Sequence, residues 1–332
     1  MKLYIRAPFT NEKIEELREL FNEIIYEPWT ETGERYYEDE MIEALQLHQP
    51  DVLITELDKV TEKVLNNYSG LKLVGDCRAV PANIEVDACS QKGIPVVCTP
   101  GRNAQAVAEM LVGLLLTYMR NIIPSVEWVK EKKWVQGTTP YYTWMGNELN
   151  RKTIGFVGFG AVGQASARIL EAFGCHIAYY DPFVNIENNN YEKKELSELF
   201  KSSDIISLHL PSIPDTDKMI NLDLLKSMKK SSILINTARS SVIDMEALES
   251  VIKNKEISGA ILDVLDNEPP SDEDLRLLEY DNVLITPHIC GATFEVTDHQ
   301  SAIMTERLKN YFQKGLKEGV LYNYKNLGER NE

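Results

Sequence analysis

Three glycines in the spacing G-x-G-x-x-G, at Gly158, Gly160 and Gly163, are suited to binding a phosphate-bearing ligand. They follow the apolar run 154–157, which is typical of a buried strand, and they precede apolar residues at helical spacing. Glycine permits a tight turn and a close approach of the backbone, and a helix N-terminus offers free N–H groups to phosphates. The pattern predicts a dinucleotide-binding loop, whereas a glycine-rich turn without a ligand is the alternative.

An acidic residue ends the second apolar run after the glycines. Asp181 lies 18 residues beyond Gly163, where a carboxylate can accept hydrogen bonds from the ribose hydroxyls. Its negative charge would repel a 2′-phosphate, and no arginine follows it closely. We therefore expect NAD rather than NADP as the cofactor.

Three more reactive side chains follow apolar runs that are typical of strands. Arg239, Glu268 and His288 come after the runs 232–236, 259–264 and 283–285. Ligands of open α/β sheets bind outside the carboxyl ends of the strands, so these side chains are expected at the same edge as the glycines. A histidine exchanges protons near neutral pH, a carboxylate stabilises its charged form, and an arginine binds an anionic group. This set predicts hydride transfer between a nicotinamide ring and a hydroxyl carbon.

Taken together, these motifs resemble the D-isomer-specific 2-hydroxyacid dehydrogenase family over nearly the whole chain. The resemblance rests on the glycine loop, His209-Leu-Pro211, Asn-Thr-Ala-Arg239, Asp263-Val-Leu-Asp-Asn-Glu268-Pro and Pro-His288-Ile. It implies that His288 is the acid/base, that Glu268 holds and polarises it, and that Arg239 binds the substrate carboxylate. The chain most resembles the phosphoglycerate-dehydrogenase-like branch, without a regulatory domain.

The same resemblance implies a set of cofactor contacts. Asp263 would lie on the nicotinamide side, and His209 near the adenosine or the phosphates. The expected contacts are Gly158, Gly160, Ala161, Val162, Gly163, Asp181, His209, Pro211, Thr216, Thr237, Ala238, Arg239, Asp263, His288 and Gly291. None of the five cysteines stands at a metal-ligand spacing, and no metal is expected.

A loop in the first hundred residues is expected to contact the substrate. In the resembling family this loop is glycine-rich, and its backbone N–H groups hold the substrate carboxylate. Here Arg78, Ala79 and Val80 are the expected substrate contacts, although glycine or small residues are usual at the last two positions and Pro81 donates no N–H. Arg78 would suit a phosphorylated or otherwise dianionic substrate, and an arginine that points to solvent is the alternative.

The composition narrows the classes of partner. A formal charge of −16 argues against nucleic acid or an anionic membrane as the main partner. The apolar run 106–119 is too short to cross a bilayer.

An odd number of cysteines, five, and a first segment that does not resemble a signal peptide predict reduced thiols in a cytoplasmic protein.

The alternation of strand and helix patterns predicts two α/β domains, each a doubly wound parallel sheet. Residues 1–101 plus 295–332 are expected to form a flavodoxin-like substrate-binding domain. Residues 102–294 are expected to form a Rossmann NAD-binding domain. Among the helices, we expect one at 58–65 and another at 192–200.

The segment 121–150 is rich in tryptophan and tyrosine and has little strand pattern. Aromatic residues on such an excursion suit a subunit interface, so a homodimer is expected, with a packed surface loop as the alternative. The leading hypothesis is therefore an NAD-dependent oxidoreductase that interconverts a small D-2-hydroxy acid and its 2-oxo acid. The alternatives are an NAD(H)-sensing binding protein of the same fold with little turnover, and an inactive relative whose loop at Ala79 and Val80 excludes the substrate.

Overall fold

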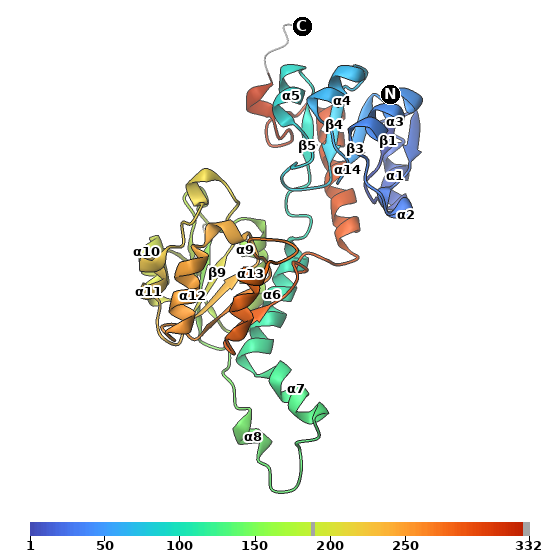
Figure 1. Cartoon of the computed structure of the whole chain (residues 1–332). Helices are drawn as coiled ribbons and strands as arrows, with labels where there is room; N and C mark the ends of the chain where they lie inside the picture. The colour runs from blue at the N-terminus through green and yellow to red at the C-terminus, as the bar shows by residue number, and fades with distance from the viewer. Residues whose placement is uncertain (187–189, 328–332) are drawn as a thin grey trace. The chain divides into compact units, whose positions relative to one another are not determined.

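The structure, a computed structural model, describes residues 1–186 and 190–327 (Figure 1). Residue contacts divide the chain into two compact units. Unit 1 comprises Met1–Arg102 and Thr293–Glu332, and unit 2 comprises Asn103–Ala292. The last residues of the expected substrate-binding domain lie outside the described part of the chain.

Unit 1 contains a parallel sheet of five strands in the order β2-β1-β3-β4-β5, the flavodoxin-like order. Its strands are β1 (Lys2–Ile5), β2 (Glu23–Tyr26), β3 (Val52–Thr55), β4 (Leu73–Asp76) and β5 (Val96–Cys98). Its helices are α1 (Asn11–Leu17), α2 (Trp29–Thr32), α3 (Glu38–His48), α4 (Glu62–Asn67), α5 (Val86–Gln91) and α14 (Val296–Lys314). Met304 and Leu308 of α14 share one apolar core with β1 and β3, so the C-terminal helix completes this unit.

Unit 2 contains a parallel sheet of seven strands in the order β12-β11-β10-β9-β6-β7-β8. Its strands are β6 (Thr153–Val157), β7 (His176–Tyr180), β8 (Tyr191–Lys193), β9 (Ile205–Leu208), β10 (Ile233–Asn236), β11 (Gly259–Leu262) and β12 (Val283–Ile285). Its helices are α6 (Ala104–Met119), α7 (Ile122–Lys130), α8 (Pro140–Thr143), α9 (Ala161–Ala172), α10 (Leu196–Ser202), α11 (Leu222–Ser227), α12 (Met245–Lys253) and α13 (Asp272–Leu275). The predicted fold class, two doubly wound parallel sheets, is confirmed.

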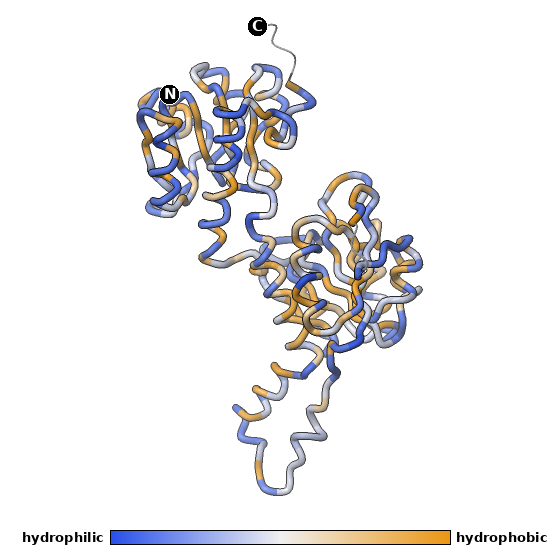
Figure 2. Tube along the Cα trace, turned by 180° about the vertical axis from the view of Figure 1, so that it is seen from behind, coloured by the Kyte–Doolittle hydropathy of each residue, from blue (hydrophilic) through white to orange (hydrophobic). Residues whose placement is uncertain are grey.

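Helices cover both faces of the unit 2 sheet, and alternate residues of each strand point to opposite faces. In β10, Leu234 packs with α10, α11 and α12, whereas Ile233 and Ile235 pack on the side of α6 and α9. Figure 2 shows long apolar stretches of the chain within unit 2. Burial on both faces explains why these strands are continuous apolar runs.

Helix α6 explains the longest apolar run of the sequence. Eight of its side chains are buried, including Leu111 and Leu115, which are fully enclosed. No single helix in the described residues is long and apolar enough to cross a membrane, and only α6 with α7, bent by 62°, pass that test of length and composition as a pair. Packing in the core of unit 2 therefore accounts for the composition of α6.

Helices α7 and α8 lie on an excursion that projects from the rest of unit 2 (Figure 1). Trp128 and Trp144 pack edge to face on each other, but most of its other large apolar side chains are exposed. They include Ile122, Ile123, Val126, Val129, Trp134, Val135, Tyr141, Tyr142 and Met145. Such a surface is much more apolar than the exposed surface of an ordinary loop.

Two helix boundaries differ from expectation. The helix expected at 58–65 begins only at Glu62, because Asp58 is held by Thr55 and Arg6 and because Val60 bridges to a neighbouring segment. The helix expected at 192–200 starts at Leu196, since Tyr191–Lys193 pairs with β7 as an edge strand.

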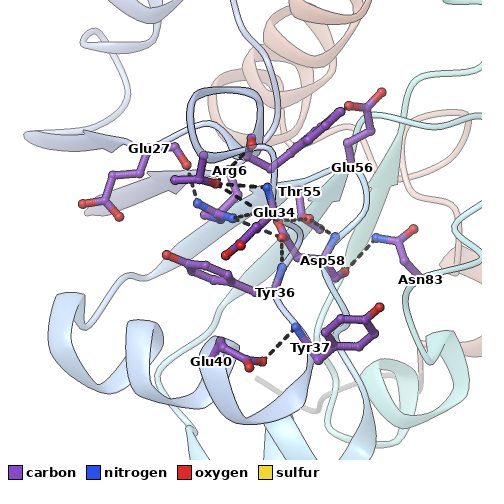
Figure 3. A network of polar contacts seen from close by, with 12 residues as sticks. Arg6, Glu27, Glu34, Tyr36, Tyr37, Glu40, Thr55, Glu56, Asp58 and Asn83 are labelled. Carbon is purple, nitrogen blue, oxygen red and sulfur yellow. Dashed lines mark hydrogen bonds and ion pairs between the residues drawn. The ribbon is translucent and has the colours of Figure 1, made fainter.

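The point where the strand order of unit 1 reverses, between β1 and β3, is filled by the chain's own side chains (Figure 3). Arg6 forms a fully buried ion pair with Asp58. The guanidinium carbon of Arg6 lies 3.6 Å from the centroid of the Tyr36 ring. The backbone N–H of Tyr36 donates to Asp58, and Arg6 donates to the carbonyl oxygens of Glu27 and Glu34. Ligands of such sheets usually bind at this switch point, so in unit 1 a ligand must bind elsewhere along the edge.

All five cysteines are free and buried. Burial raises the pKa of each thiol, for example that of Cys175 to about 11. These side chains therefore behave as small core residues.

Candidate active site

The glycine loop joins β6 to α9 with the geometry that its spacing predicts. Gly158 has a φ of +86°, and a Cβ there would lie 2.6 Å from the carbonyl oxygen of His209. A Cβ on Gly163 would lie 2.8 Å from the carbonyl oxygen of Gly158. A Cβ on Gly160 would meet nothing within 4 Å. Two of the glycines are therefore required by close packing, and Gly160 borders open space.

Beside that open space, the first turn of α9 offers unused donors. Gly160 is the N-cap of this helix, and the backbone bond that opens the turn runs from the N–H of Gln164 to the carbonyl oxygen of Gly160. Among the residues described, no acceptor binds the N–H groups of Ala161, Val162 and Gly163. Free N–H groups at the positive end of a helix fit a pyrophosphate.

Asp181 fastens the glycine loop to the turn after β7. Its carboxylate accepts hydrogen bonds from the backbone N–H groups of Phe159 at 2.8 Å, Phe183 at 2.8 Å and Val184 at 3.0 Å. A carboxylate offers about four acceptor positions, so one remains for a ribose hydroxyl. The side chain of Phe183 is 94% exposed beside this turn.

The loop after β9 holds the expected His209, Pro211 and Thr216. His209 Nε2 lies 2.9 Å from the hydroxyl of Ser207, and burial lowers the pKa of His209 to about 4. This imidazole is therefore neutral at pH 7, which is unsuited to supplying a proton. The Thr216 hydroxyl donates to the carbonyl oxygen of Pro211 at 2.6 Å, so its observed role is to shape the loop.

Arg239 follows β10 on a turn that Asn236 shapes. The Asn236 side chain accepts from the N–H of Ala238 at 3.0 Å and donates to the carbonyl oxygen of Arg239 at 2.8 Å. The Arg239 guanidinium is exposed, donates only to the carbonyl oxygen of Ala238, and has no carboxylate partner within the described residues. The buried Thr237 hydroxyl also lacks a partner there. The exposed guanidinium is therefore free to bind a ligand.

Asp263, at the end of β11, organises the turn that carries His288. It is 1% exposed and accepts from the Thr286 hydroxyl at 2.5 Å, from the Ile289 N–H at 3.0 Å and from the Cys290 N–H at 2.8 Å. His288 lies between these anchors with a φ of +54°, a left-handed conformation that few non-glycine residues adopt. Asp263 thus fixes the backbone on both sides of the histidine.

The side chains of His288 and Glu268 are joined by a short polar contact. His288 Nδ1 lies 2.6 Å from Glu268 Oε2, and both side chains are partly exposed. Because Nδ1 is engaged, Nε2 is the ring nitrogen available to a ligand. A Cβ on Gly291, three residues on, would lie 2.6 Å from Asn103 Nδ2, so the Asn103 side chain would have to move.

Arg239, Asp263 and His288 therefore follow three adjacent parallel strands, β10, β11 and β12. Asn236 and Thr286 were not expected among the site residues. Both look like ordinary strand-end residues in the sequence, and only their hydrogen bonds across the edge reveal them. The one available signal was their position directly after apolar strands.

In unit 1, the expected substrate-binding loop begins after β4. Arg78 is partly exposed, whereas Ala79 and Val80 are exposed. The guanidinium of Arg78 has no partner among the described residues. The structure therefore leaves the loop accessible.

The comparisons with known proteins agree on one family. Residues 112–290 match the family described as D-isomer specific 2-hydroxyacid dehydrogenase, NAD binding domain. A Bacillus subtilis (strain 168) protein named "Putative 2-hydroxyacid dehydrogenase YoaD" is 44% identical over 325 residues, covering 97% of this chain and 94% of that protein. The hydroxypyruvate reductase of Thermotoga maritima is 37% identical over 279 residues, covering 83% and 89%.

Among solved structures, the D-lactate dehydrogenase of Aquifex aeolicus in complex with NAD and lactic acid is 28% identical. Its TM-score is 0.71, and the match covers 97% of this chain and 99% of that one. The TT0316 protein of Thermus thermophilus is also 28% identical, with a TM-score of 0.78 and coverage of 97% and 100%.

Proposed function

This chain belongs to the D-isomer-specific 2-hydroxyacid dehydrogenase family, and on that premise we propose that it interconverts a small D-2-hydroxy acid and its 2-oxo acid with NAD. The observation that carries the proposal is the 2.6 Å contact between His288 Nδ1 and Glu268 Oε2. This pair supplies a proton carrier at the carboxyl edge where the glycine loop also lies.

Bound NAD supplies the hydride chemistry, since its nicotinamide ring can accept the hydride from C2 of the hydroxy acid. His288 Nε2 would take the hydroxyl proton as the carbonyl forms, and it would return that proton when the 2-oxo acid is reduced. Glu268 would stabilise the positive imidazolium through Nδ1. Arg239, which has no carboxylate partner within the described residues, would bind the α-carboxylate through two parallel hydrogen bonds.

The cofactor would be held by groups that are otherwise unused. The N–H groups of Ala161, Val162 and Gly163 would bind the pyrophosphate, and the remaining acceptor position of Asp181 would take a ribose hydroxyl. A fixed carboxylate at Asp181 favours NADH over NADPH, because a 2′-phosphate would be repelled. Equal kcat/KM values for the two cofactors would contradict this preference.

The substrate would be a small acid, and a phosphoglycerate-like acid is the finer proposal. It is supported by relatives named D-3-phosphoglycerate dehydrogenase, of which one from Synechocystis is 34% identical over 262 residues. That match covers only 46% of the relative, so it bears on the shared part alone.

Two further proposals concern the oligomeric state of the enzyme and its cellular location. The exposed apolar side chains of α7 and α8 support a homodimer formed through this excursion. The buried, free cysteines are consistent with a cytoplasmic location. Light scattering of the purified protein would test the first proposal, since a monomer at micromolar concentration would contradict it.

The central experiment is a screen of 2-oxo acids for NADH oxidation. We expect turnover with at least one small 2-oxo acid and formation of the D-2-hydroxy acid. The alternative, an NAD(H)-sensing protein, predicts NADH binding without turnover across the whole panel. That outcome would overturn the proposed activity.

A further inference from the structure

A cavity of about 1030 Å³ lies at the amino edge of the unit 2 sheet, the edge opposite the candidate active site. Its floor is formed by residues that directly precede strands, among them Lys152 before β6, Asp204 before β9 and Asn282 before β12. Helices α6 and α12 both end beside it, at Met119 and Lys253. All of the lining residues belong to unit 2. The volume is sufficient for a ligand of nucleotide size.

Hydrogen bonds between residues of unit 2 hold the floor of this cavity in place. The Tyr118 hydroxyl donates to the carbonyl oxygen of Ser258 at 3.0 Å, and the side-chain amide of Asn282 donates to the same oxygen at 3.1 Å. The Asp204 carboxylate accepts from the ammonium group of Lys229 at 2.9 Å. These polar groups are therefore engaged, and the charge of Asp204 is compensated.

Four lysine side chains that line the cavity are not engaged in this way. They come from separate places along the chain and are Lys152, Lys230, Lys253 and Lys255. Within the described residues, none of them forms an ion pair with a carboxylate. Besides Asp204, the carboxylates of the lining are those of Glu279 and Asp281. The cavity therefore has more free lysines than carboxylates, although the whole chain has a formal charge of −16.

Lysines that converge on a cavity favour an anion, and their type narrows its chemistry. An ammonium group is a compact point charge with three donors, whereas the planar fork of an arginine matches a single carboxylate. Point charges from several segments suit a ligand whose negative charge is spread over several groups, as in an oligophosphate. Ile123, Met145 and Ile252 also line the cavity and offer apolar contact area to a nucleoside.

We propose that this cavity is a second ligand site, which binds an oligophosphate either free or as part of a nucleotide. Strands β10, β11 and β12 run from the cavity to the turns that carry Arg239, Asp263 and His288. At the rise of a β-strand, their length separates the two edges by roughly 10–13 Å. A ligand of the cavity would therefore leave the glycine loop free for NADH. The proposal does not rest on the proposed function.

The test measures the binding of inorganic tripolyphosphate by calorimetry to the protein saturated with NADH, which occupies the free N–H groups of the glycine loop. Lys230→Ala combined with Lys253→Ala should raise the Kd by at least ~10-fold, because two charge-assisted contacts are lost. Both side chains are exposed and have no ion-pair partner in the described residues, so their truncation should leave the fold intact.

Lys201→Ala combined with Lys226→Ala is the matched control. These exposed lysines stand in the last turns of α10 and α11, as Lys253 does in α12, but they do not line the cavity. Their removal lowers the charge of unit 2 by the same amount and should leave the Kd unchanged.

A second arm replaces tripolyphosphate with ATP and separates the two sources of the ligand. A lower Kd for ATP would assign the cavity to a nucleotide, and an equal or higher Kd would assign it to a free oligophosphate.

Two results would overturn the proposal. The parent could bind neither compound at millimolar concentrations, as expected if a second copy of the chain covered the cavity. Alternatively, the parent and the Lys230→Ala, Lys253→Ala variant could bind with the same Kd. Neither result depends on turnover, so the proposed function would stand. A protein that reduces no 2-oxo acid but shows lysine-dependent binding would lose only the proposed function.

Discussion

The carboxyl edges of the two sheets differ in how the turns at the expected site residues are held, although unit 2 also keeps unused donors at Arg239 and in the first turn of α9. In unit 2, the side chains of Asn236, Asp263 and Asp181 each accept backbone N–H groups of the turns that carry the predicted site residues. In unit 1, the loop at Arg78 has free N–H groups and, within the described residues, an unpaired guanidinium. In unit 2, side-chain acceptors hold these turns in place before any ligand binds. In unit 1, a ligand could accept hydrogen bonds from the N–H groups of the loop.

Removing the proton carrier should have the largest effect. His288→Ala is expected to lower kcat by ~10²–10⁴-fold, because the proposed mechanism routes the hydroxyl proton through this imidazole. NADH titration followed by fluorescence should give a dissociation constant close to that of the parent. His176→Ala, at an exposed histidine at the start of β7, is the control. Full activity in His288→Ala would remove the histidine from the mechanism.

A substitution at Asp263 tests whether activity requires the turn around His288 to be held in place before a ligand binds. Asp263→Asn keeps the shape of the side chain. Its NH₂ group, however, would face one of the backbone N–H groups that now donate to the carboxylate. Leaving a buried donor unpaired costs about 1–3 kcal/mol, so kcat should fall by ~10- to 100-fold. Asp266→Asn, on the same segment but exposed, is the matched control. If both variants retain the parent's pH profile and kcat, activity does not depend on the anchoring of His288.

A smaller effect should appear in the pH dependence of stability. The pKa of His209 is about 4 in the folded chain and about 6.5 when unfolded, so between these values only the unfolded chain takes up the proton. Stability should therefore fall as the pH drops from about 6.5 to about 4, by up to ~3 kcal/mol. His209→Gln should lose this component. Urea denaturation of the parent and the variant at pH 7 and pH 4.5 would show it, and equal changes in both proteins would contradict it.

The smallest effect is expected at the buried carboxyl of unit 1. Burial raises the pKa of Asp76 well above its ordinary range, which favours the uncharged acid. Asp76→Asn introduces an uncharged amide of similar volume, so the free energy of unfolding should change by less than ~1 kcal/mol. Asp58→Asn is the contrast, because it breaks the buried pair with Arg6 and should cost ~3–5 kcal/mol. Similar losses in the two variants, measured by urea denaturation, would mean that Asp76 is ionised and compensated.

The sequence was sufficient to predict the parts of this structure that depend on local pattern. The order of strand, glycines, helix and acid around Gly158 predicted the turn between β6 and α9, and Arg239, Glu268 and His288 were singled out because each follows an apolar strand. Strand β8 was missed, since Tyr191–Lys193 is polar and pairs only at the sheet edge. Asn236 and Thr286 were missed because their roles depend on atoms that approach only when distant strands align.

The expected substrate contacts show the same limit. Arg78 could be singled out by its charge, but the absence of a partner within the described residues depends on where Glu56 and Asp76 lie. Glu56 is committed to Arg102, and Asp76 is buried without a partner in the part of the chain that the structure describes. Neither fact can be inferred from the spacing of these residues along the chain.

The shielding of the five native thiols from solvent has a practical consequence. A maleimide dye added to the folded protein should find no ready site of attachment, because every sulfur atom is shielded. A cysteine introduced in each unit, by Leu47→Cys in unit 1 and Phe173→Cys in unit 2, would then be the only reactive pair. Energy transfer between two fluorophores at these sites would report the distance between the units in solution, and its change as NADH and a 2-oxo acid are added.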